Sequence, residues 1–141
     1  PRYECLQPEY NLYDREGYEA ELEPLCRAEH IGVIGYYALA SGFLSGKYRS
    51  EKDFAKSPRG EDMGRYMNDR GFRILKALDE VAAEAKATPA QVAIAWEAAR
   101  PSVTAPIVSA TKLEQAQQIV GAMNLKLSAA AIGKLDRASA P

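Results

Sequence analysis

The chain has 141 residues, of which 47% are hydrophobic and 26% are charged, a composition typical of a folded globular domain. Its formal net charge is −1 and its basic residues are not clustered, which argues against a nucleic-acid partner. No apolar run approaches the ~18 residues of a membrane span, so we expect no membrane partner.

The first third of the chain alternates between strand and helix patterns. A short strand is predicted at the start of residues 3–11, before Pro8 interrupts it. Residues 18–30 carry apolar side chains at helical spacing and predict an amphipathic helix. The apolar run at residues 31–36 follows at once and predicts a strand covered on both faces, as in a parallel sheet.

A polar segment and a helix come next. Residues 48–68 contain glycine and proline and show no periodicity, which predicts a long loop, with room for a short turn of helix. Long loops in compact domains are often lids or binding segments. Residues 69–86 then place apolar side chains on one face of a helix.

Capping motifs predict where the later helices begin. Thr88 is followed by Pro89 and then Gln91, which predicts a helix start with a capping box. Thr111 and Glu114 have the same spacing and predict a second capping box.

The last predicted strand lies in residues 102–110, although Pro106 argues against a central position in a sheet. Ser128 is predicted to cap the final helix. The helix between them has an apolar face made of Leu113, Ala116, Val120 and Met123.

Strands that alternate with helices predict an α/β fold with three parallel strands and no internal domain boundary in residues 1–141. Three strands make an open sheet with two unprotected edges, which is not a finished architecture. Cys5 and Cys26 are interpreted as two reduced core thiols, which favours a reducing compartment and a cytoplasmic location.

Polar and small residues follow each predicted strand, where parallel α/β folds bind ligands. Gln7 offers an amide, Tyr36 a flat ring and residues 38–42 backbone N–H groups for a pyrophosphate. Lys47 offers a point charge, and residues 109–112 offer a hydroxyl and a cation at a helix start. Together these parts predict a site for an extended dinucleotide.

Four stretches, "QPEYNLYDR", "GVIGYYALASGFLSGKY", "TPAQVAIAW" and "TAPIVSATKLEQ", resemble the C-terminal part of the aldo-keto reductase family. They occur in the family's order and cover nearly the whole chain. The resemblance implies the C-terminal portion of a (β/α)8 TIM barrel that binds NADPH in an extended pose. It makes residues 3–7, 31–36 and 104–108 the last three barrel strands.

The resemblance also implies a role for each matching position. Gln7 would bond the nicotinamide carboxamide, Tyr36 would stack on the nicotinamide ring, and Arg59 would lie in the loop that folds over the cofactor. The positions implied at the pyrophosphate are Tyr37, Ala38, Leu39, Ser41 and Lys47. Those implied at the adenosine end are Ser109, Thr111, Lys112, Gln115 and Gln118.

Three positions depart from the family's pattern. Many members have Pro, Gly and Asn where this chain has Ala38, Ser109 and Ile119. Ile119 cannot donate a hydrogen bond to adenine. The hydroxyl and cation at the helix start favour a 2′-phosphate, and therefore NADP over NAD.

The resemblance implies an NADPH-dependent oxidoreductase that reduces small aldehydes or ketones to alcohols. The family's catalytic Tyr, Lys, Asp and His belong to earlier strands, so this segment is expected to contain no catalytic residue and to be inactive alone. We expect the N-terminal part of the barrel, or other copies of the chain, to cover its edge strands. The alternatives are a nucleotide-binding regulatory or partner-binding subunit, as potassium-channel β-subunits illustrate, and a fragment that binds nothing.

Two patterns could be mistaken for catalytic or metal sites. Asp62 and Tyr66 have the spacing of the family's catalytic Asp and Tyr, but they fall in the polar loop and are interpreted as solvated residues. His30 is interpreted as a helix-end residue, where the helix dipole favours a cation. With one histidine and no ligand-spaced cluster, no metal site is expected.

Overall fold

The computed structural model of the chain describes residues 1–56 and 60–141. Its strands are β1 (Cys5–Leu6), β2 (Gly32–Gly35) and β3 (Ala105–Pro106). Its α-helices are α1 (Glu23–Ala28), α2 (Asp69–Ala85), α3 (Pro89–Ala98), α4 (Leu113–Met123) and α5 (Ala129–Ser139). Shorter turns of π or 3-10 helix are η1 (Tyr18–Leu22), η2 (Ala40–Ser45), η3 (Glu51–Lys56) and η4 (Gly60–Tyr66).

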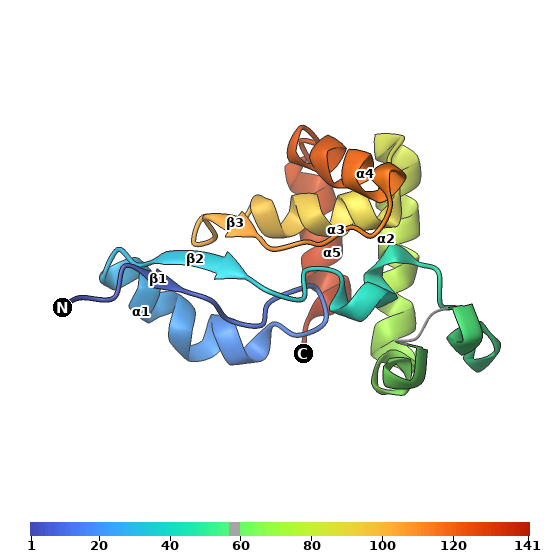
Figure 1. Cartoon of the computed structure of the whole chain (residues 1–141), viewed down its shortest axis with the longest axis horizontal. Coiled ribbons are helices and arrows are strands. Elements are labelled where there is room, and N and C mark those ends of the chain that lie inside the picture. The colour runs from blue at the N-terminus through green and yellow to red at the C-terminus, as the bar shows by residue number, and fades with distance from the viewer. Residues whose placement is uncertain (57–59) are drawn as a thin grey trace.

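The three strands form one parallel sheet in the order β1-β2-β3, which confirms the predicted α/β class. Pro106 lies in the edge strand β3, and the amides of Thr104 and Ile107 on either side of it donate to β2 carbonyls at 2.7 Å. Figure 1 shows α1 beneath β1 and β2, with α2 to α5 gathered toward the other end of the molecule. Helix α3 packs against both α2 and α4, and α5 packs against α2.

Aromatic side chains fill much of the core and join the polar segment to it. The ring of Tyr66 is fully buried, stacks on Phe43 at 5.0 Å and meets Tyr13 edge-on at 4.8 Å. The interpretation of Tyr66 as a solvated loop residue is therefore wrong, whereas Asp62 is exposed. The predicted long loop at residues 48–68, with room for a short turn of helix, contains two short 3-10 helices, η3 and η4.

Two of the three predicted helix caps are confirmed. Thr88 Oγ1 accepts from the backbone N–H of Gln91 at 3.2 Å, and the backbone N–H of Thr88 donates to Gln91 Oε1 at 3.0 Å. Ser128 Oγ accepts from the backbone N–H of Ala131 at 3.1 Å. The predicted Thr111 cap is wrong, because α4 begins one residue later, after Lys112.

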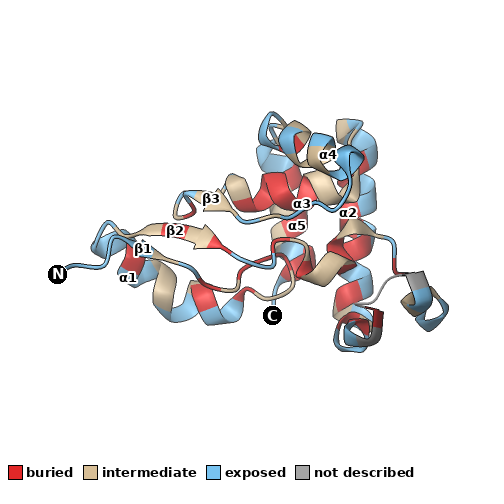
Figure 2. Ribbon diagram, in the orientation of Figure 1, coloured by how far each residue is buried: buried red, intermediate tan, exposed pale blue. Residues whose placement is uncertain are grey.

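The strands and one helix face are less covered than their patterns predict. Cys26 is buried as expected, but Cys5 is exposed, because nothing in the described chain packs over that side of β1. Three of the four residues of the apolar face of α4 are also exposed: Leu113, Val120 and Met123. Figure 2 shows burial concentrated in α3 and along the inner side of α2.

Two helical glycines are expected to respond oppositely to substitution by alanine. A Cβ added at the buried Gly71 of α2 would collide with the Tyr66 carbonyl oxygen, whereas one added at Gly133 of α5 would meet only the end of the long Arg137 side chain, at 3.3 Å. Alanine is normally preferred in helices, so Gly133→Ala should stabilise by about 0.5 to 1 kcal/mol. Gly71→Ala should instead destabilise by roughly 1 to 2 kcal/mol. Urea unfolding of both variants tests this, and stabilisation by Gly71→Ala would contradict it.

Among the helices described, none combines the length and the apolar character needed to cross a membrane.

Candidate functional site

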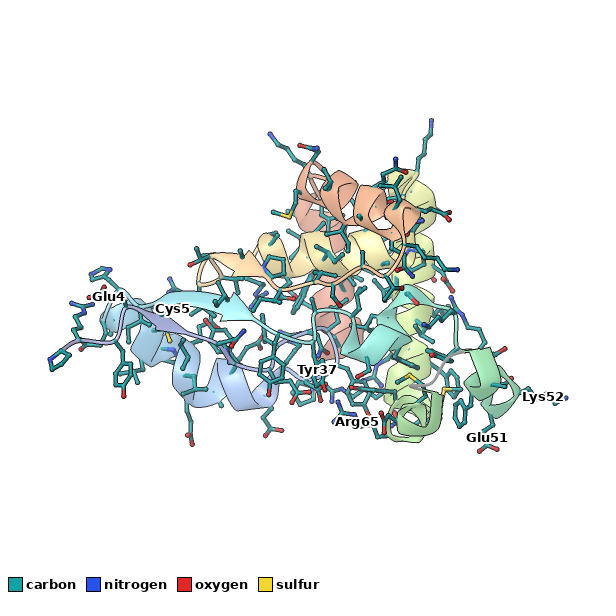
Figure 3. All side chains as sticks on the ribbon, viewed as in Figure 1. Glu4, Cys5, Tyr37, Glu51, Lys52 and Arg65 are labelled. Carbon is teal, nitrogen blue, oxygen red and sulfur yellow. The ribbon has the colours of Figure 1, made fainter. Side chains whose placement is uncertain are left out.

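A cleft of about 610 Å³ opens beyond the carboxyl ends of β2 and β3. Its walls come from four segments: residues 36–47 after β2, the start of α3, residues 107–111 after β3, and α4. Tyr37 lies past the end of β2, whereas Cys5 lies on β1 toward the other end of the molecule (Figure 3). The cleft thus lies at the edge of the sheet where parallel α/β folds place their ligands.

The turn after β2 has an unusual backbone. Tyr37, Ala40 and Ser41 have φ values of 61°, 47° and 56°, and Gly42 has 100°. Such left-handed conformations cost of order 1 kcal/mol or more for a residue other than glycine and persist only where the surroundings impose them. Here the Tyr37 carbonyl accepts from the Ala40 amide at 2.7 Å and from Asn11 Nδ2 at 3.1 Å. Backbones of this kind create concave sites for anions.

A cation lies beside this turn. Lys47 lines the cleft, and its Nζ lies 4.9 Å from the centre of the Tyr48 ring. A Cβ added at Gly42 would lie 3.2 Å from Nζ, so glycine at that position makes room for the ammonium group. Arg49 Nε donates to the Gly46 carbonyl at 2.7 Å and secures the turn that carries Lys47. This end of the cleft is suited to a phosphate.

The rest of the cleft is formed by α3, α4 and the segment between β3 and α4. Gln115 Oε1 accepts from the Thr111 amide at 2.9 Å and from Thr111 Oγ1 at 3.1 Å. Gln91 Nε2 donates to the Gln118 carbonyl at 3.3 Å, which links α3 to α4. The side chains of Ile94 and Ile119 supply apolar wall between these amides.

The structure brings most of the predicted site residues together. The ones that line the cleft are Tyr36, Tyr37, Ala38, Leu39, Ser41, Lys47, Ser109, Thr111, Gln115 and Gln118. Gln7 and Lys112 are exposed and lie outside the lining, and Arg59 lies outside the described residues. Tyr36 is 37% exposed, and its ring centre lies 5.1 Å from that of Tyr37. Tyr36, Lys47 and Thr111 therefore share one cleft.

Sequence reasoning missed the contribution of α3 to this cleft. Ala90, Gln91 and Ile94 all line it. The only sequence signal was the capping box at Thr88, which already explained Gln91 locally. Within the described residues, no group of three or more metal-ligating side chains is present.

A cleft at the carboxyl ends of parallel strands, lined by a left-handed turn, a lysine and several amide groups, defines an α/β protein of the barrel class. The comparison with protein families is more specific, because the model of the aldo/keto reductase family matches residues 2–140. The chain belongs to the aldo/keto reductase family.

Individual relatives agree with this assignment. The chain is 36% identical over 124 residues to a probable voltage-gated potassium channel subunit beta from Arabidopsis thaliana, covering 84% of the chain and 38% of that protein. It is 27% identical over 139 residues to an NADP(+) aldo-keto reductase from Schizosaccharomyces pombe, covering 95% of the chain and 41% of that protein.

A solved structure gives the same fold. The crystal structure of a thermostable aldo-keto reductase in complex with the inhibitor epalrestat superimposes with a TM-score of 0.69 at 25% identity. The match covers 95% of the chain and 39% of that protein. The chain thus spans about two fifths of the length of these relatives, and its open three-stranded sheet corresponds to part of a TIM barrel.

Proposed function

We propose that this chain is the cofactor-binding part of an NADP-dependent oxidoreductase that reduces small aldehydes or ketones to alcohols. The observation that carries the proposal is the shared cleft, in which an aromatic platform, a left-handed turn with a lysine, and a set of hydroxyl and amide groups follow one another. NADPH, when bound, supplies the hydride for such a reduction.

The residues of the chain fit parts of that cofactor. Tyr36 presents a half-exposed ring for the nicotinamide, and the backbone of residues 37–42 with Lys47 would hold the pyrophosphate. Gln7 does not line the cleft, but it would still reach the nicotinamide carboxamide, because its segment lies beside Tyr36. The backbone N–H of Tyr36 donates to the Pro8 carbonyl at 2.9 Å and holds the two segments together. These side chains bind and orient, and none of them is proposed to transfer a proton.

The adenosine end is proposed to hold the 2′-phosphate that distinguishes NADP from NAD. Ser109 and Thr111 offer hydroxyl groups there, and Lys112 is the N-cap residue of α4 and offers a cation. The catalytic groups are proposed to lie on the N-terminal part of the barrel, which the longer relatives possess. Neither His30 nor Tyr66 lines the cleft. Burial raises the pKa of Tyr66 to about 12. We propose that residues 1–141 act as one unit in a cytoplasmic protein.

Replacing Lys47 tests the assignment of the pyrophosphate site. In the complete protein, Lys47→Met should raise the KM for NADPH by roughly ten- to hundredfold, since one charge-assisted contact to a phosphate contributes about 1.5 to 3 kcal/mol. Steady-state oxidation of NADPH with small aldehydes, followed by absorbance, measures this. The matched control is Lys52→Met, whose exposed side chain on η3 lies outside the cleft and should leave the KM unchanged. Equal effects of both changes would overturn the assignment.

A second candidate function is a nucleotide-binding subunit that serves a partner protein. The observation in its favour is the 36% identity to a protein named as a probable potassium channel subunit beta. The turnover assay and a fluorescence titration with NADPH together separate the two: NADPH binding without turnover of any aldehyde or ketone would favour the subunit, and turnover favours the reductase.

A further inference from the structure

The part of the cleft between α3 and α4 has apolar walls. Ile94 of α3 and Ile119 of α4 both line the cleft. Ile94 is almost completely buried, so the wall that it forms is fixed by the packing of α3. If the phosphates occupy the turn after β2, as the proposed function requires, this part of the cleft receives the purine base of the cofactor. Apolar contact with the faces of a flat ring stabilises its binding, and this contribution does not depend on the polar groups at the edge of the ring.

Two side-chain amides that line the cleft are already engaged with protein groups. Gln91 Oε1 accepts from the backbone N–H of Thr88 at 3.0 Å, and Gln91 Nε2 donates to the backbone carbonyl of Gln118 at 3.3 Å. Gln115 uses Oε1 for the Thr111 amide and hydroxyl. These bonds fix the orientation of both amides.

The side chain of Gln118 differs from these two. It lines the cleft and, within the part of the chain that the structure describes, its amide takes part in no hydrogen bond. An amide that no neighbour fixes can turn over by 180°, which exchanges its donor and acceptor positions. It therefore adapts to whichever pattern of groups a bound base presents.

Adenine and hypoxanthine differ in that pattern. Adenine presents an amino donor beside a ring-nitrogen acceptor, and hypoxanthine presents a carbonyl acceptor beside a ring N–H donor. A fixed amide would satisfy one base and leave a polar group unpaired against the other. From the apolar walls and the unfixed amide, we infer that this site accepts a purine dinucleotide phosphate without discriminating adenine from hypoxanthine, so that Ile119 and Gln118 set a relaxed base specificity.

The inference rests on the proposed function and is tested by equilibrium titration of the complete protein with NADPH and with its hypoxanthine analogue. Binding is followed by the fluorescence of the reduced nicotinamide. The two dissociation constants should agree within about threefold. A preference of tenfold or more for NADPH, the size that one fixed hydrogen bond produces, would overturn the inference and leave the proposed function intact. Failure of both compounds to bind would instead overturn the proposed function.

Two variants locate the base. Ile119→Ala should raise the dissociation constants of both compounds by the same factor, roughly five- to twentyfold, because it removes apolar contact with the base. Gln118→Leu should raise both dissociation constants equally, by roughly two- to fivefold. The control is Leu113→Ala, an exposed residue of α4 outside the cleft, which should change neither constant. If Ile119→Ala also changes neither, the base does not lie in this part of the cleft and the inference is wrong.

Discussion

Glu97→Gln is expected to stabilise the protein by an amount that grows as the pH rises. Glu97 is fully buried on α3, and among the described residues neither carboxyl oxygen has a hydrogen-bond partner. The carboxyl lies against Gly35, where an added Cβ would collide with Oε1. Burial raises the pKa of Glu97 from 4.5 to about 8.

The sign of the pH dependence follows from that pKa. Between about pH 4.5 and pH 8 the unfolded chain releases the Glu97 proton while the folded protein keeps it. The unfolded state therefore binds fewer protons, and the free energy of unfolding falls as the pH rises through this window. Glutamine does not titrate, so the advantage of Glu97→Gln over the natural protein should widen by roughly 3 kcal/mol from pH 5 to pH 8.

Urea unfolding at pH 5, 6, 7 and 8 measures this difference directly. The control is Glu114→Gln, an exposed glutamate of α4, which should give a small and constant difference at all four values. Parallel stability curves for Glu97→Gln and the natural protein would mean that the buried carboxyl has a partner in solution.

The position of Glu97 shows why the core of α3 could not be predicted from the sequence. The capping box fixed where α3 begins, but helical periodicity assumes that one face of a helix meets water. The consecutive residues Val92 to Glu97 are all buried, because α3 is packed between α2, α4 and the end of the sheet. A carboxylate in such a stretch is indistinguishable by pattern from one on a solvated face.

The α/β class and the cleft were more accessible to sequence reasoning. The alternation of strands and helices is a local property, and so is the run of small residues after β2 that allows a left-handed turn at Ser41 and Gly42. Exposure was not predictable in the same way. The spacing of Leu113, Val120 and Met123 correctly places them on one face of α4, but spacing carries no information about what covers that face.

Tyr66 illustrates the converse limit. It lies in a polar segment without periodicity, and it is buried because Phe43 and Tyr13, distant in the sequence, provide rings for it to pack against. Such contacts depend on tertiary structure alone. The same reason hid Gln91, whose cleft position follows from the packing of α3 against α4.

Arg15→Met is expected to destabilise the protein by about 3 to 4 kcal/mol, because it leaves buried groups without partners. Arg15 Nε and Nη2 each donate to Glu19 at 2.9 Å, and Nη1 donates to Ser139 Oγ at 2.7 Å and to the Asp136 carbonyl at 3.0 Å. The guanidinium also lies 5.4 Å from the centre of the Trp96 ring. One side chain thus ties the N-terminal segment to α5 and α3.

Glu19 would lose both of its hydrogen bonds from Arg15 in that variant. Burial alone would raise the pKa of Glu19, but hydrogen bonds from Arg15 and from the Tyr10 hydroxyl outweigh it and lower the pKa below its usual value. Removing Arg15 leaves a half-buried carboxylate with a weaker set of donors. Part of the loss should therefore be relieved in the double variant Arg15→Met/Glu19→Gln, which removes the uncompensated charge.

Arg49 provides a control that also makes two bonds to one carboxylate, but in a different environment. It makes a two-bond pair with Asp79 at 2.7 and 2.8 Å, but its side chain is 44% exposed, against 10% for Arg15. Exposed ion pairs are screened by water and contribute little, so Arg49→Met should cost less than about 1 kcal/mol. Chemical unfolding of the two variants at one pH gives the comparison. If both substitutions cost the same, burial is not what makes the Arg15 network stabilising, and the contribution must be assigned to the two-bond carboxylate pair that each arginine makes.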